Sequence, residues 1–189
     1  LAQKAFEITY KYDSLIFEWF QNYNNKDDDE IIKKNINFNL EKTLSLRYGE
    51  NPHQSAGFYF SKNNRSSLLL GKKIQGIDLS YNNINDVEAA INIVCEFEKP
   101  AVSIIKHANP CGVSEANDIN IAWENAYKTD PKSAFGGIVA INRTINRKLA
   151  KKLTDIFLEV VIAPKVTTEA RKILSTKQNL RVLIYPNFL

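Results

Sequence analysis

The pair Lys106-His107 is the strongest candidate for chemistry in this sequence. It directly follows the apolar run at residues 101–105, and in an open α/β sheet ligands bind beyond the carboxyl ends of the strands. A neighbouring ammonium disfavours the imidazolium form, so the ring stays neutral and able to move protons near pH 7, while the lysine stabilises developing negative charge. An exposed Lys-His pair without a role explains the dipeptide equally well. Residues 109–112, Asn-Pro-Cys-Gly, predict a turn after it.

A second polar cluster covers residues 47–54, with the sequence Arg-Tyr-Gly-Glu-Asn-Pro-His-Gln. The guanidinium of Arg47 offers a planar fork of donors for a phosphate, and Tyr48 adds a hydroxyl beside it. The alternative is a polar surface loop with an exposed arginine. Residues 80–83, Ser-Tyr-Asn-Asn, precede a predicted helix, where the amides either bind a ligand or cap the helix. Capping explains only one of the two asparagines.

A third cluster, residues 130–137, has the sequence Asp-Pro-Lys-Ser-Ala-Phe-Gly-Gly and precedes a predicted strand. Gly136 and Gly137 would let a ligand approach the backbone, and Phe135 could stack on a planar ring. A tight turn with a core phenylalanine explains the same residues. Without other support, that simpler interpretation is the better one.

Metal sites fit the sequence poorly. Zinc needs three or four ligands, and the histidines and cysteines show no ligand spacing (His53, Cys95, His107 and Cys111). Cys111 follows a proline, as in the Pro-Cys-x-x-Cys half of a zinc deaminase site, but the fourth position is Ser114 and neither histidine begins a His-x-Glu triplet. Cys95 is predicted to lie in the core. The phosphate-binding glycine motifs of mononucleotide and dinucleotide sites do not occur.

The elements that must position these clusters alternate regularly from residue 75 onward. Helices are predicted to begin at Asn85, with Glu88 completing a capping box, at Asp118, at Asn146 and over residues 168–174. Short apolar runs predict the strands between them (residues 101–105, 138–141, 160–163 and 181–185). This alternation is typical of a mostly parallel sheet covered by helices on both faces, a three-layer α/β sandwich.

The first 40 residues differ in composition from the rest. Spaced apolar residues predict a helix over residues 1–20, and the Asn- and acid-rich stretch at 22–30 reads as a linker. The run Asp27–Glu30 could bind a cation, but a solvated loop fits better because hard-metal loops space their ligands. Residues 1–40 carry five Lys and seven Asp or Glu, which leaves a net +6 for the remainder. That excess is too diffuse for a nucleic-acid track and suits a phosphorylated small molecule.

Composition excludes several broad classes. The 189 residues are 44% hydrophobic and 24% charged. This length and apolar content suit one globular domain, or one domain and part of a second. No apolar run approaches the ~20 residues that span a bilayer, and no secretory signal pattern occurs. Two cysteines without framework spacing favour the cytoplasm. The chain contains no Met and begins at Leu1, so we expect it to be a piece of a longer protein.

Taken together, the three clusters and the segment 80–83 resemble the bacterial AICAR formyltransferase/IMP cyclohydrolase family, in order and in rough spacing. The resemblance runs over residues 43–185, and residues 1–20 resemble the segment that leaves the cyclohydrolase domain. It implies that residues 1–40 are the tail of that domain with a linker, and that residues 41–189 are the first half of the formyltransferase domain. The implied fold is a three-layer, cytidine-deaminase-like α/β sandwich without zinc, preceded by a helix and linker.

The family transfers a formyl group from 10-formyltetrahydrofolate to the 5-amino group of AICAR, giving FAICAR in purine biosynthesis, and its N-terminal domain is an IMP cyclohydrolase. The resemblance implies that His107 shuttles the proton of the attacking amine and that Lys106 stabilises the oxyanion. It also implies a homodimer with shared active sites, and neither a nucleic-acid partner nor a membrane. The implied substrate-binding residues are Arg47, Tyr48, Asn83, Phe135, Gly136 and Glu159.

Two points stay open at this stage. Glu159 directly precedes the predicted strand at 160–163, so a simple parallel sheet would place it at the edge opposite Lys106, unless that strand runs antiparallel. A non-catalytic nucleotide-binding or dimerisation module with the same fold is the alternative function. The intact Lys106-His107 pair argues against it, since a module that only binds needs no proton shuttle. The fragment alone is expected to be inactive, because the rest of the folate pocket lies beyond Leu189.

Overall fold

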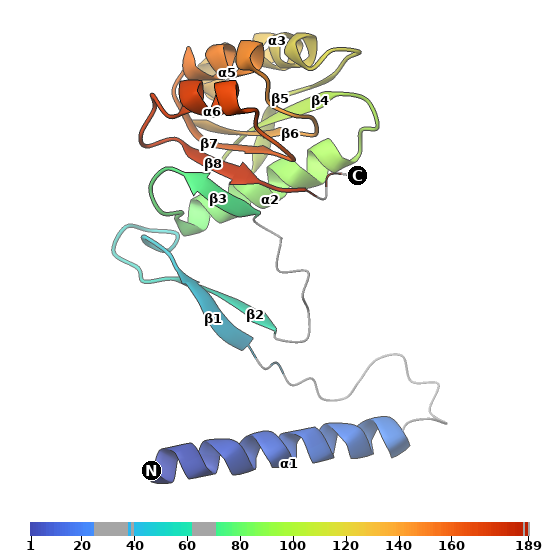
Figure 1. The fold of residues 1–189 in the computed structure, drawn as a ribbon, viewed down its shortest axis with the longest axis vertical. Helices are drawn as coiled ribbons and strands as arrows, with labels where there is room; N and C mark the ends of the chain where they lie inside the picture. Colours follow the sequence, from blue (N-terminus) through green and yellow to red (C-terminus); the bar gives the residue numbers. More distant parts are fainter. Residues whose placement is uncertain (25–37, 39, 62–70, 187, 189) are drawn as a thin grey trace. The chain divides into compact units, whose positions relative to one another are not determined.

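The computed structural model describes residues 1–24, 38, 40–61, 71–186 and 188. It divides into two compact units, Leu1–Phe38 and Asn39–Leu189, each described here by itself (Figure 1). The predicted acidic run at 27–30 lies outside the described residues. The described residues of the first unit form the helix α1 (Ala2–Asn24), which confirms the helix predicted at its start. Its large apolar side chains are exposed in this unit, with Leu15 at 66% and Trp19 at 58%.

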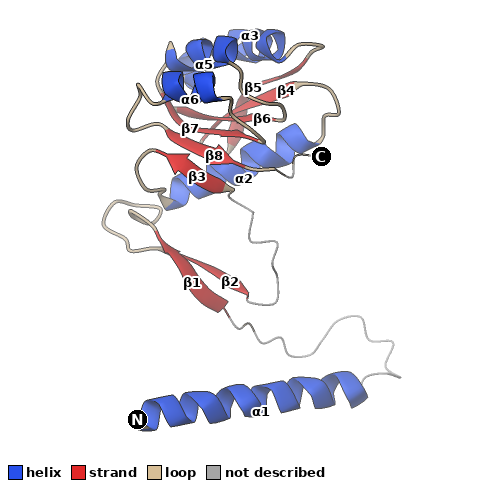
Figure 2. Cartoon of the chain, in the orientation of Figure 1, coloured by secondary structure: helices blue, strands red, loops and turns tan. Residues whose placement is uncertain are grey.

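The second unit contains a six-stranded sheet between two layers of helices (Figure 2). Helix α2 (Tyr81–Cys95) packs on one face. The other face carries α3 (Ile119–Thr129), α5 (Arg147–Thr154) and α6 (Thr168–Leu174). The strands, in order across the sheet, are β3 (Lys72–Gln75), β8 (Arg181–Ile184), β7 (Leu158–Ala163), β6 (Gly137–Ile141), β4 (Ala101–Lys106) and β5 (Asn109–Glu115). The predicted three-layer α/β sandwich is confirmed.

The sheet is mixed, so the prediction of a mostly parallel sheet is wrong in this detail. Only β6, β7 and β8 run parallel to one another. Strand β4 is antiparallel to both β5 and β6, and β3 is antiparallel to β8. Residues 109–112, predicted as a turn, begin β5 instead, and the turn lies at His107-Ala108. An edge strand tolerates proline and polar residues, which is why β5 showed no apolar signal.

Helix α2 begins five residues before the predicted start, which had Asn85 as its N-cap. Its N-cap is Ser80, whose hydroxyl accepts from the backbone N–H of Asn83, while the Asn83 side chain accepts from the Ser80 N–H. The box predicted at Asn85 and Glu88 is therefore wrong, and Cys95 is exposed, not in the core. The other predicted caps are confirmed: Asp118 caps α3 and Asn146 caps α5.

Three further elements were not predicted from the sequence. Strands β1 (Leu40–Ser45) and β2 (Gly57–Ser61) form an antiparallel pair, and the short helix α4 (Pro131–Ala134) precedes β6. The connection between β1 and β2 contains the 47–54 cluster. Its backbone binds to the start of α2, since Arg47 N donates to Leu79 O at 3.0 Å and Tyr81 N donates to Tyr48 O at 3.2 Å. The cluster is thereby held at one edge of the large sheet.

Candidate active site at one edge of the sheet

The reversed direction of β4 brings the predicted site residues to a common edge of the sheet, which is the side where strands begin or end and not an outer strand. Because β4 is antiparallel to β6, its carboxyl end lies beside the amino end of β6, and β7 begins at the same edge. Lys106 ends β4, Gly136 precedes β6, and Glu159 is the second residue of β7. The strand that carries Glu159, β7, is parallel to its neighbours, so the suggestion that it runs antiparallel is wrong. Glu159 shares an edge with Lys106 because β4 is the reversed strand.

The Lys106 ammonium is anchored to the backbone that enters β6. Its Nζ donates to the carbonyl oxygens of Phe135 at 3.1 Å and Gly136 at 2.9 Å. Gly136 has a φ of +70°, and its N–H donates to Phe157 O at 2.8 Å. An ammonium has three donors, so two carbonyls leave one for a ligand. Lys106 is therefore a fixed cation beside an accessible edge.

His107 lies in a two-residue turn between β4 and β5. Lys106 pairs with Asn109 across the ladder, and the intervening residues have φ values of +53° at His107 and +57° at Ala108. The Ala108 N–H donates to Asp86 Oδ1 at 2.7 Å, and Asn109 Nδ2 donates to His107 O at 2.7 Å. The His107 side chain is exposed, so its imidazole is accessible to a substrate.

A polar network joins the start of α2 to β7 and β8. Asn83, only 4% exposed, donates through Nδ2 to Glu159 Oε2 at 2.8 Å. The guanidinium of Arg181, also 4% exposed, lies 3.8 Å from the same oxygen and donates to Asp78 O at 3.0 Å. Burial lowers the pKa of Arg181, although the nearby Glu159 opposes this shift. The Glu159 carboxylate is therefore fixed between an amide and a buried cation.

Arg47 and Tyr48 add an exposed cation near this network. The Arg47 guanidinium lies 5.5 Å from the centroid of the Tyr48 ring. Its charge also contributes to lowering the pKa of Arg181, which is the sign expected of two neighbouring cations. An exposed guanidinium beside a buried one forms an environment that favours an anionic ligand.

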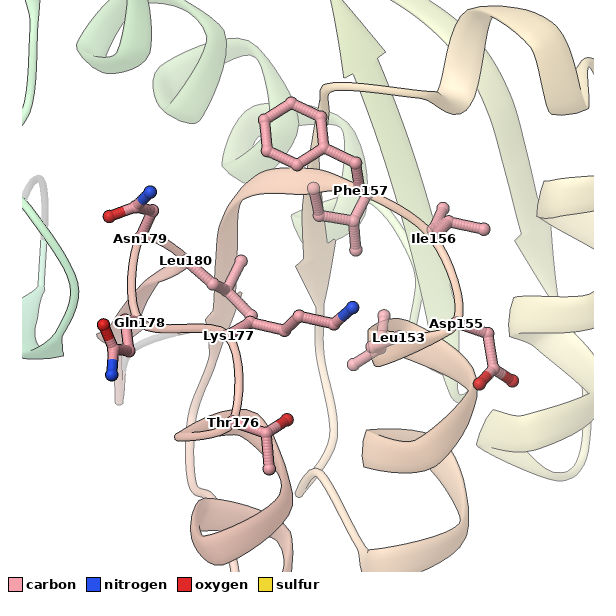
Figure 3. A pocket seen from close by; sticks show the side chains of 10 residues that line it. Leu153, Asp155, Ile156, Phe157, Thr176, Lys177, Gln178, Asn179 and Leu180 are labelled. Carbon is pink, nitrogen blue, oxygen red and sulfur yellow. The ribbon is translucent and has the colours of Figure 1, made fainter.

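Phe135 is 63% exposed, which excludes the alternative that it belongs to the core. Its ring lies 5.3 Å from that of Phe157, which is itself 50% exposed. Phe157 also lines a pocket of about 400 Å³ at the start of β7, where the Lys177 side chain extends toward Leu153 and Asp155 (Figure 3). The two rings therefore form an accessible aromatic surface beside Lys106.

The structure brings together all eight predicted site residues along one edge of one unit. Sequence reasoning missed Asp86, Phe157 and Arg181, which hold or extend them. The available signal for Arg181 was a charged residue at the head of an apolar run; Asp86 and Phe157 had none. Among the described residues, no group of three or more His, Cys, Asp or Glu is placed to hold a metal ion. None of the helices described is long and apolar enough to cross a membrane.

Comparison with known proteins decides the family. The family model described as the AICARFT/IMPCHase bienzyme matches residues 1–188. The chain belongs to this family. The resemblance of the four motifs to this family is thus confirmed.

Curated relatives agree over nearly the whole chain. It is 50% identical over 184 residues to the bifunctional purine biosynthesis protein PurH of Rhodospirillum rubrum, covering 97% of this chain and 34% of the relative. It is 47% identical over 186 residues to PurH of Bacillus cytotoxicus, covering 97% and 35%. The PurH of a Thermoanaerobacter species is 48% identical over 183 residues, with the same coverage as the Bacillus protein. The chain therefore spans about a third of the length of these relatives.

Proposed function

We propose that the protein containing this chain transfers the formyl group of 10-formyltetrahydrofolate to the 5-amino group of AICAR, giving FAICAR in purine biosynthesis. Family membership and the PurH relatives support this assignment. We further propose that residues 1–40 are the tail and linker of an IMP cyclohydrolase domain and that residues 41–189 are the first half of the formyltransferase domain. The protein would act in the cytoplasm as a homodimer with shared active sites, and the fragment alone would be inactive.

In the proposed reaction the amine of AICAR attacks the formyl carbon. His107 takes a proton from the attacking nitrogen, and the Lys106 ammonium stabilises the oxyanion of the tetrahedral intermediate. Collapse of the intermediate breaks the bond between the formyl carbon and N10 of the folate, and the imidazolium returns the proton to N10. One carbon–nitrogen bond forms and one breaks, and the proton lost by the amine ends on N10 of the folate.

The remaining residues would bind AICAR. Arg47 and Tyr48 would hold its phosphate, since an exposed guanidinium accommodates two phosphate oxygens. Asn83 and Glu159 would face the rest of the nucleotide. These roles follow from the family resemblance and the polar network supports them.

Gly136 and Phe135 would line the pocket between Lys106 and the heterocycle. The exposed Phe135 ring offers a flat face, and the glycine leaves room beside the ammonium.

The observation that carries the proposal is the anchoring of Lys106 next to the His107 turn, at the edge that also holds Arg47 and Glu159. A nucleotide-binding or dimerisation module needs no such pair.

The test is His107→Ala in the full-length protein, assayed for formyl transfer and titrated with AICAR by calorimetry. We expect turnover to be lost, by roughly 10²-fold or more, with AICAR affinity largely retained. Wild-type turnover in this variant would contradict the role of His107. Absence of formyl transfer in the wild-type protein would favour the binding module instead.

A further inference from the structure

Asp86 lies in the second turn of α2 and contacts the turn that carries His107. Its Oδ1 accepts a hydrogen bond from Ala108 N at 2.7 Å. A hydrogen bond from a backbone N–H to a carboxylate is among the stronger kinds in proteins. The contact joins two elements separated by 22 positions in the chain, so it depends on the packing of α2 beneath β4 and β5.

The turn needs such a contact because its own sequence disfavours its conformation. His107 and Ala108 are the two non-glycine residues with positive φ in the described part of the chain. Two-residue hairpin turns of this type favour Asn-Gly or Asp-Gly, since a Cβ is disfavoured in the left-handed region. A His-Ala pair is held there by surrounding structure, as strained backbone at functional sites usually is.

Lys106 is positioned by a different set of contacts. Its ammonium binds the carbonyls of Phe135 and Gly136, neither of which contacts Asp86 in the hydrogen-bond pattern. A change in the turn would therefore move His107 while leaving the ammonium in place. The relative placement of imidazole and ammonium thus depends on Asp86.

We propose that Asp86 is a positioning residue for formyl transfer: by binding Ala108 N it holds the left-handed His107-Ala108 turn and aims the imidazole at the substrate amine. The inference rests on the proposed function. In this proposal Asp86 does not contact the substrate, so replacing it lowers turnover only by displacing His107.

The experiment compares Asp86→Ala, Asp86→Asn, Ala108→Gly and the double variant Asp86→Ala/Ala108→Gly in the full-length protein. Asp86→Ala should lower kcat about 10- to 100-fold, the effect of a small misplacement of a catalytic group, and leave the KM for AICAR within about 2-fold. Asp86→Asn keeps an acceptor oxygen and should restore most of kcat. Because glycine adopts the left-handed region without steric cost, the double variant should regain part of the loss.

Glu88→Ala is the matched control, since Glu88 is an exposed acid two residues further along the same helix. It should retain wild-type kcat. An unchanged kcat in Asp86→Ala would overturn the inference. It would also be overturned if the kcat of Asp86→Asn were no higher than that of Asp86→Ala and the effects of the two single substitutions on kcat simply multiplied in the double variant.

Amide exchange separates this inference from the proposed function. Deuterium uptake at the Ala108 amide should rise in Asp86→Ala and not in Glu88→Ala, whatever reaction the protein catalyses. Faster exchange together with no formyl transfer in the wild-type protein would refute the function and keep the contact; unchanged exchange would refute the contact itself.

Discussion

The ammonium of Lys106 occupies the space that a side chain at position 136 would need. A Cβ built on Gly136 would lie 2.8 Å from Lys106 Nζ, and the positive φ of this residue independently disfavours any other amino acid. The left-handed backbone therefore favours glycine at position 136, and a larger residue there would also displace the Lys106 ammonium. Asn83 and Glu159 also constrain each other, because their side chains are joined by a hydrogen bond.

Arg47 gives a sharp prediction at this scale. Replacing it with alanine should weaken AICAR binding about 10- to 100-fold, the loss expected for charge-assisted hydrogen bonds to a phosphate. Calorimetric titration of the full-length variant measures the change. Arg171→Ala, an exposed arginine of α6, is the control and should bind with wild-type affinity. An unchanged affinity in Arg47→Ala would remove this residue from the site.

Helix α2 is the element that organises the edge. Its capping residues Ser80 and Asn83 set where it begins, and the same Asn83 binds Glu159. One turn further, Asp86 holds the turn after β4. The buried Ser103 hydroxyl donates to Ala90 O at 2.8 Å, which ties β4 to this helix near its middle. A small shift of the helix start would therefore move both Asn83 and Asp86, and with them the contacts to Glu159 and to the turn after β4.

Paired cap variants test this dependence. Ser80→Ala and Thr167→Ala each remove an N-cap hydroxyl, from α2 and α6 respectively, and each should lower the free energy of unfolding by about 1 kcal/mol. Only Ser80→Ala should also reduce formyl transfer, because it alone loosens Asn83. Denaturant titration and a turnover assay make the comparison. Equal turnover in the two variants would show that the cap of α2 has no bearing on the site.

At the scale of the whole molecule, acid stability depends on carboxylates at helix starts. Hydrogen bonds from the side chain and the backbone of Asn120 lower the pKa of Asp118 from its ordinary 3.8. The Ser133 hydroxyl and N–H lower the pKa of Asp130 in the same way. A carboxyl whose pKa is depressed on folding stabilises the folded state above its unfolded pKa, and this contribution is lost as the pH falls through the folded value.

Asp118→Asn therefore has a predictable pH signature. Asparagine is a good N-cap but does not titrate, so stability at pH 7 should change little. Between pH 5 and about pH 2.5 the variant should lose less stability than the wild type. Urea unfolding of the full-length protein at several pH values measures this difference. Parallel stability–pH curves for the two proteins would show that Asp118 makes no contribution.

Local sequence was sufficient for part of the fold. The spacing of apolar residues predicted α1 and the strands β4, β6, β7 and β8, and local hydrogen-bonding geometry predicted the caps Asp118 and Asn146. These features are set within a few residues of chain. The three clusters and the segment 80–83 were also sufficient to identify the family, since each is a contiguous stretch of sequence.

Only the tertiary structure decided strand direction and, with it, the arrangement of the site. Strand pairing joins residues far apart in the chain, so periodicity cannot reveal that β4 runs against β6. That reversal is what places Lys106 at the same edge as Gly136 and Glu159. The Asp86 contact and the burial of Arg181 have the same origin: each depends on which element packs alongside, and no local pattern encodes that neighbour.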